Sequence, residues 1–255
     1  TIANLEKLWL DWNHTSGLML RLGQFTEGFK YLKKLSLSLG SQKDEITSLI
    51  REILKKALHL ETMSIYYYSG LKISWPGAFC ENLCGLYVYK CPHLTTLVPS
   101  EVFFFYLKEL EISECHGLKY LFTSSVANKL KHLEEIRVEG CTSMETIVKK
   151  EKNESSEDTI FEQLNWISLS SLSSLECFYS GKDTLLVPSL IQVNISQCPK
   201  MKFFSQGSIQ HEAKSFRGIQ TASDSDDDLV LHEDPNLSVE VVFLQQQVRT
   251  FTQIN

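Results

Sequence analysis

No run of apolar residues in the sequence reaches the roughly 18 uncharged positions that a membrane-spanning helix requires. An excess of positive charge is also lacking, because the net charge is -6 and the Lys and Arg residues are scattered along the chain. A surface that binds the phosphate backbone of a nucleic acid needs clustered basic side chains. We therefore expect no membrane span and no nucleic-acid partner.

Motifs for phosphate and metal binding are lacking as well. No G-x-x-x-x-G-K-[ST] loop occurs, so we assign no nucleotide to these residues. One group of residues has side chains of the types that bind zinc but lacks the paired C-x2-C spacing of structural zinc sites. Its members are Cys80, Cys84, Cys91 and His93. We expect no cofactor and no metal in this chain.

Catalytic arrangements are equally weak. Cys115 and His116 are adjacent in the sequence, so their side chains do not face each other as a nucleophile and its base must. Glu109 and Glu111 share one face of an expected strand, but an open strand face has no pocket to exclude water. The sequence therefore predicts a binding protein and not an enzyme.

What the sequence does contain is one repeated pattern: an apolar residue, two variable residues, an apolar residue, one variable residue and a third apolar residue. First positions of successive copies lie 23 to 31 residues apart, close to the period of about 20–29 residues in leucine-rich repeats. The eight copies are Leu5/Leu8/Leu10, Leu32/Leu35/Leu37, Leu60/Met63/Ile65, Leu83/Leu86/Val88, Leu107/Leu110/Ile112, Leu133/Ile136/Val138, Leu164/Ile167/Leu169 and Leu190/Val193/Ile195.

Three residues after the last apolar position, leucine-rich repeats carry Asn or Cys. The chain has Asn13, Cys91, Cys115, Cys141 and Cys198 at this point. Such regular placement indicates small buried groups and reduced thiols, as in the cytosol. We predict an α/β fold: a leucine-rich-repeat solenoid (horseshoe) of about eight irregular repeats, with a parallel β-sheet on its concave face.

Between the strands, return segments complete each repeat. Asp44 is expected to cap a helix that ends near Leu58, and Ser124 or Ser125 a second helix. The longest interval contains residues 149–159, whose Lys, Glu and Ser content indicates a disordered insertion. The pattern stops after about Gly207, so we predict a solenoid over 1–207 and an acidic, largely disordered tail over 208–255.

Three segments of the second half resemble a known family. They are LKELEISECHGLKYLF (107–122), LEEIRVEGCTSMETIV (133–148) and PSLIQVNISQCPKMKFFS (188–205). They are similar to the C-terminal leucine-rich repeats of plant coiled-coil-type nucleotide-binding disease-resistance receptors. The family's endings appear here as Cys115/Leu118/Leu121/Phe122, Met144/Glu145/Ile147/Val148 and Cys198/Pro199/Met201/Phe204. The resemblance is strong over 83–207 and looser over 1–82.

This resemblance implies a cytoplasmic immune receptor. Its repeats would sense a pathogen effector or a guarded host protein and restrain the receptor's nucleotide-binding domain. ADP or ATP would then bind only to a domain upstream of this chain. Two alternatives stay open: the substrate-recruiting repeats of an F-box ubiquitin ligase subunit, and an extracellular receptor ectodomain. Glycosylation of the N-x-[ST] sequons at Asn13, Asn153, Asn194 and Asn236 would favour the ectodomain.

Binding is expected on the concave face, where the strand residues that flank the inward apolar pair point outward. Tyr66, Tyr87 and Tyr89 would form an aromatic patch beside an acidic one, and such rings are frequent at binding hot spots. The acidic patch comprises Glu109, Glu111, Glu135 and Glu139, with Arg137 among them and Trp166, Gln192 and Asn194 beyond. Its carboxylates would favour a basic partner surface.

Overall fold

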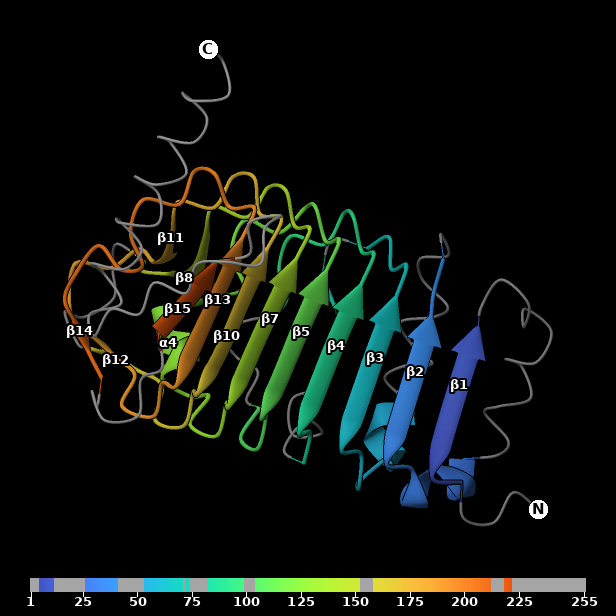
Figure 1. The fold of residues 1–255 in the computed structure, drawn as a ribbon. Helices are drawn as coiled ribbons and strands as arrows, with labels where there is room; N and C mark the ends of the chain where they lie inside the picture. The colour runs from blue at the N-terminus through green and yellow to red at the C-terminus, as the bar shows by residue number, and fades with distance from the viewer. Residues whose placement is uncertain are drawn as a thin grey trace.

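A computed structural model describes residues 5–11, 26–40, 53–70, 72–73, 82–98, 104–151, 158–211 and 218–221. Nine parallel strands form one sheet, and Figure 1 shows them side by side from β1 to β15. In sheet order they are β1 (Lys7–Asp11), β2 (Lys34–Ser38), β3 (Thr62–Tyr66), β4 (Gly85–Tyr89), β5 (Glu109–Ser113), β7 (Glu135–Glu139), β10 (Trp166–Ser170), β13 (Gln192–Ser196) and β15 (Gly218–Thr221). The predicted repeat solenoid is confirmed.

The strand register follows the repeat pattern residue by residue. The second apolar position of each copy pairs with the same position in the next copy, as Leu86 pairs with Leu110 and Leu110 with Ile136. From β2 to β13 both apolar strand residues are buried, and their neighbours point to the other side of the sheet. Because side chains alternate along a strand, one pattern supplies both a core face and an exposed face.

A tight turn built around a residue with positive φ follows β3, β4, β5, β7, β10 and β13. These residues are Tyr67, Lys90, Glu114, Gly140, Ser171 and Gln197. The first five donate their backbone N–H to the last carbonyl of the next strand, as Lys90 does to Ser113 at 2.9 Å. The turn therefore continues the hydrogen-bond ladder of the sheet and reverses the chain direction.

Cysteine follows the positive-φ residue in four of these turns. The thiol of Cys91 donates to the carbonyl of Tyr89 at 3.3 Å and accepts the N–H of Tyr68 at 3.4 Å. Cys115 and Cys141 repeat this geometry, since the N–H of Cys115 lies 3.4 Å from the Cys141 sulfur. The six cysteines among the described residues are free thiols. Small polar sulfurs thus satisfy backbone groups that the turn would leave buried.

The return side of the solenoid is formed mainly by short strands. One three-stranded sheet contains β6 (Phe122–Thr123), β8 (Thr146–Lys149) and β11 (Cys177–Tyr179). A second contains β9 (Thr159–Ile160), β12 (Leu185–Leu186) and β14 (Ile209–Gln210). Between these sheets and the large sheet lies a row of fully buried rings, with neighbouring centroids 4.6 to 6.2 Å apart; it consists of Phe122, Phe161, Phe178 and Phe204.

Helix is scarce in the described residues. A 3-10 helix, η1, covers Thr26–Tyr31, and residues 53–56 are helical within the first predicted helix, whose expected cap Asp44 lies outside the described residues. The second predicted helix is only α4 (Ser124–Ala127). Its expected cap is wrong, because Thr123 occupies the N-cap position without a capping side-chain hydrogen bond. Strand β6 runs directly into this short helix and sets where it begins.

Two predicted disordered regions contain ordered parts. The insertion predicted over 149–159 is ordered at both ends, because Lys149 closes β8 and Thr159 opens β9; residues 152–157 lie outside the described set. Beyond residue 207, where the repeats were predicted to end, Ile219 of β15 pairs with Val193 of β13. The acidic run at 224–228 is not among the described residues.

Candidate protein-binding face

The face of the large sheet that carries the first, third and fifth residue of each strand is here called the open face. From β1 to β13 all of these residues are exposed or partly exposed except Ser38 and Gly85. Every residue predicted for binding lies on this face, in the rows that the register defines. The alternation of side chains along the strands is sufficient to place all of them there.

Aromatic rings stack along the N-terminal third of the open face. Tyr66 and Tyr89 are parallel neighbours with centroids 5.0 Å apart, and Trp9 stacks on the other side of Tyr66 at 5.6 Å. Trp9 reaches across β2 because that strand carries only Ser36 and Ser38 there. Sequence reasoning did not include Trp9, although its place between Leu8 and Leu10 obeys the same alternation. Its side chain is 63% exposed, the largest apolar exposure on this face.

Tyr87 does not join this stack, although the sequence grouped it with Tyr66 and Tyr89. Its ring lies over Gly85, where a Cβ atom would stand 2.9 Å from the ring edge. From there its hydroxyl donates to the carboxylate of Glu109 on the next strand. The missing side chain at Gly85 therefore turns Tyr87 toward the acidic patch.

The acidic patch lies on β5 and β7 in the middle of the open face. Glu109 pairs in register with Glu135, and Glu111 with Arg137, whose guanidinium forms an ion pair with Glu135. Four carboxylates and one guanidinium leave a local charge of -3, counting Glu139. Like charges on directly opposed residues destabilise a sheet, so a cationic group from outside would relieve this repulsion.

Both tyrosines beside the patch are held in the protonated form. Partial burial is the main cause and the hydrogen bond to Glu109 the second; together they raise the pKa of Tyr87 well above its usual value. Burial and the nearby Glu111 raise the pKa of Tyr89 in the same direction. At neutral pH these hydroxyls therefore act as hydrogen-bond donors.

Neutral residues occupy the open face on β10 and β13. The amide of Gln192 donates to the Asn194 side-chain oxygen at 2.9 Å, and serines surround this pair. The indole N–H of Trp166, on β10 between Glu135 and Gln192, is buried and has no hydrogen-bond partner. The face thus has an aromatic, an acidic and a neutral polar zone in strand order.

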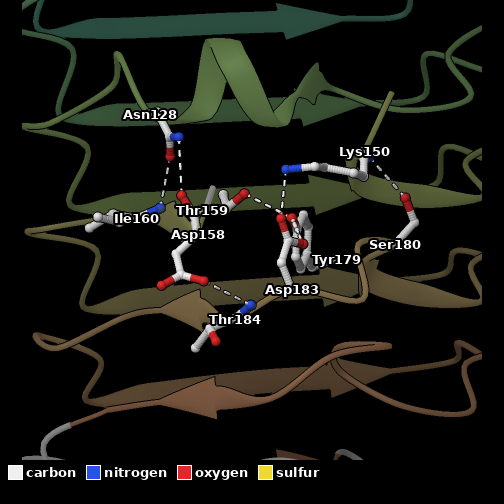
Figure 2. Close-up of polar contacts among 9 residues, drawn as sticks. All are labelled: Asn128, Lys150, Asp158, Thr159, Ile160, Tyr179, Ser180, Asp183 and Thr184. Carbon is white, nitrogen blue, oxygen red and sulfur yellow. Dashed lines mark hydrogen bonds and ion pairs between the residues drawn. The ribbon is translucent and has the colours of Figure 1, made fainter. Parts of the chain in front are cut away.

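A separate polar cluster lies on the return side, where Figure 2 shows it between the two small sheets. The ammonium of Lys150 is 2.6 Å from one oxygen of Asp183, and the hydroxyl of Tyr179 donates to the other oxygen at 2.5 Å. Thr159 in turn donates to the Tyr179 oxygen at 2.9 Å. Burial alone would raise the pKa of Asp183, but the hydrogen bonds from Lys150 and Tyr179 outweigh it and hold the pKa below the usual range.

Figure 2 also shows the contact of the Lys150 N–H with the Ser180 hydroxyl and three contacts that hold the residues just after 152–157. The Asn128 side chain donates to the carbonyl of Asp158 and accepts the N–H of Ile160 at 2.8 Å. The N–H of Thr184 lies 3.2 Å from the Asp158 carboxylate. Because these groups bond to one another and join neighbouring strands, we interpret the cluster as a structural clasp and not as a reaction centre.

Residues 98–215 match a family model described as plant disease resistance protein RPS2-like, leucine-rich repeats. This stretch includes the acidic and the neutral zones and extends past residue 207 through β14. A comparison with curated proteins gave no match. Within the described residues no helix has the length and apolarity to cross a membrane.

Proposed function

We propose that the chain, whose residues 98–215 match the model of RPS2-like leucine-rich repeats of plant disease resistance proteins, is the recognition module of an intracellular immune receptor. In this role the open face binds a pathogen effector or a guarded host protein. The observation that carries the proposal is the open face, on which eight of the described strands present exposed or partly exposed side chains in rows.

The chemistry of the face supports a protein partner with a basic surface. Tyrosine and tryptophan bury large areas at low entropic cost and are enriched in binding hot spots. The carboxylates of β5 and β7 would steer a positively charged partner toward the aromatic zone beside them. Binding and not catalysis is thus the proposed activity.

A second part of the proposal concerns regulation. The resemblance to nucleotide-binding receptors implies that the repeats also contact the receptor's nucleotide-binding domain and restrain it in the cytoplasm. ADP or ATP would belong to that domain, because this sequence contains no phosphate loop. The sequence of the transcript upstream of the first residue tests this part. A phosphate-loop domain there is the expected result, and an F-box or a secretory signal would contradict it.

The recognition proposal is tested by charge reversal on the open face with a matched control. The variant E109K/E111K/E135K changes three carboxylates of the acidic patch. The control E145K/E162K/E176K changes three carboxylates that lie outside the open face and are exposed. Both variants alter the net charge equally, so long-range electrostatic effects cancel in the comparison.

Each version would be expressed in plant cells as a proximity-labelling fusion, and the labelled proteins would be quantified. We expect a set of partners that is lost with the open-face variant and retained with the control. Equal labelling by the two variants would contradict the assignment of the open face. Circular dichroism of the purified proteins verifies that both variants fold.

A further inference from the structure

Three cysteine side chains stack on consecutive turns of the solenoid. Cys91 follows β4, Cys115 follows β5 and Cys141 follows β7, and these strands are direct neighbours in the sheet. The three residues are 0% exposed. Cys198 occupies the same turn position after β13, but Leu172 takes that position after β10 and separates Cys198 from Cys141. The chain therefore holds three adjacent thiols and one matched thiol apart from them.

The backbone holds the three turns in register. Lys90 donates to Ser113 and Glu114 donates to Glu139, each at 2.9 Å, immediately before the cysteines. Neighbouring strands lie about 4.8 Å apart, within the Cα separation of about 4.4–6.8 Å that a disulfide requires. Cys91 and Cys141 are two strands apart, which exceeds the limit of about 7 Å. Only the middle thiol can therefore pair with either of the others.

The middle thiol also has a different electrostatic environment. Side-chain interactions with Cys141 and Cys91 lower the pKa of Cys115, and the contact with Cys115 raises the pKa of both neighbours. Burial raises the pKa of the isolated Cys198 to about 11. The thiolate is the reactive form of cysteine. Because Cys115 is also the only one of the three with a thiol on both sides, we expect it to form the first bond.

Whether a small oxidant can reach these sulfurs depends on opening of the turns that hold them and not on unfolding of the core. Lys90 and Glu114 precede Cys91 and Cys115 directly and are exposed, as is His116 after Cys115. Opening one turn would admit a molecule as small as a peroxide, and local openings of this kind cost less than global unfolding.

We propose that Cys115 is a redox modification site at which a peroxide drives a disulfide to Cys91 or to Cys141. The Cys115 thiolate attacks one peroxide oxygen, forming a sulfenic acid and releasing water after protonation. The neighbouring thiol then attacks the sulfenic sulfur, so a second water leaves and the S–S bond forms. Two thiols are oxidised by two electrons while one hydrogen peroxide is reduced to two waters. The product ties together two turns at the C-terminal ends of the strands that carry or adjoin the acidic patch.

The test uses the purified full chain treated with hydrogen peroxide, quenched with catalase and alkylated with iodoacetamide. Peptide mapping by mass spectrometry without reduction then identifies the linked pairs. We expect the Cys91–Cys115 and Cys115–Cys141 pairs, with Cys198 recovered in alkylated form. C91S should give only the second pair and C141S only the first. C115S should give no link among the three, and C198S should match the unaltered chain.

Three results would overturn the proposal: a Cys91–Cys141 link in C115S, a Cys198 link as abundant as those to Cys115, or the absence of any link in the unaltered chain. The complementary maps of C91S and C141S decide the matter if C115S fails to fold. A parallel oxidation in concentrated urea provides the control for geometry, because the preference for Cys115 pairs must disappear when the turns no longer stack.

Discussion

Replacing Asp183 with asparagine removes the negative charge from the clasp that joins residues on both sides of 152–157. The side chains of Lys150 and Asp183 are only 17% and 11% exposed, and their charged atoms are 2.6 Å apart. In the Asp183→Asn variant the Lys150 ammonium stays in this poorly solvated position and faces a neutral amide. The Tyr179 hydroxyl still has an oxygen to which it can donate.

The expected loss of unfolding free energy is about 3 kcal/mol. Removing one member of a buried ion pair costs about 3–5 kcal/mol, and the residual solvent contact of both groups favours the lower end of this range. An exposed pair on the same side of the molecule supplies the control. Lys119 and Glu145 are 3.0 Å apart but 66% and 57% exposed, so Lys119→Met should cost less than about 0.5 kcal/mol.

The effect also has a defined pH dependence. The folded-state pKa of Asp183 lies below its usual value, so its carboxylate stabilises the fold above the unfolded pKa of about 3.9 and loses this effect as the pH falls through the folded pKa. The difference in stability between the unaltered chain and Asp183→Asn should therefore be constant from about pH 5 to 8 and shrink in stronger acid.

Urea unfolding followed by circular dichroism measures these differences, and hydrogen exchange of peptides over 146–187 localises them. Exchange is needed because repeat proteins can unfold in parts and not in one step. We expect faster exchange in Asp183→Asn for β8, β11 and β12. If Asp183→Asn cost no more than Lys119→Met, the clasp would be energetically neutral and the reasoning refuted.

Four further substitutions test other parts of the structure. Gly207→Ala should destabilise the chain by more than about 2 kcal/mol in urea unfolding, because the added Cβ would lie 2.0 Å from the carbonyl of Asp183. Gly140→Ala should cost only about 1 kcal/mol, because its added Cβ has room and the only penalty is the positive φ of 64°. Phe178→Ala removes a fully buried ring whose centroid lies 4.6 Å from that of Phe204. It should lower the free energy of unfolding by about 3–5 kcal/mol in the same assay. A loss below about 1 kcal/mol would contradict the packing of the buried ring row. Trp9→Ala should change stability by less than about 1 kcal/mol, since the ring is mostly exposed, while weakening partner labelling in the assay for the open face.

The eight strands of the repeat pattern were predictable because a single rule fixes both their positions and their faces. Strand β15 escaped this rule: its copy would be Phe216, Ile219 and Thr221, with a polar residue in the third position. Its spacing of 26 residues from Leu190 was the available signal. The return strands were not predictable in the same way, because elements of two to four residues contain too few alternations to distinguish a strand from a loop.

Within the open face, the sequence predicted which residues share the surface but not how they divide it. Tyr87 leaves the aromatic stack because Gly85, two residues earlier, leaves room for its ring, and because Glu109 offers an acceptor on the next strand. Trp9 joins the stack because β2 carries only small serines between it and Tyr66. In both cases the direction of the aromatic side chain depends on nearby residues with a small side chain or none, and on neighbours one or two repeats away. The pattern of a single strand does not contain this information, so we expect variants of Gly85 and Ser36 to change how the aromatic rings are arranged on the open face.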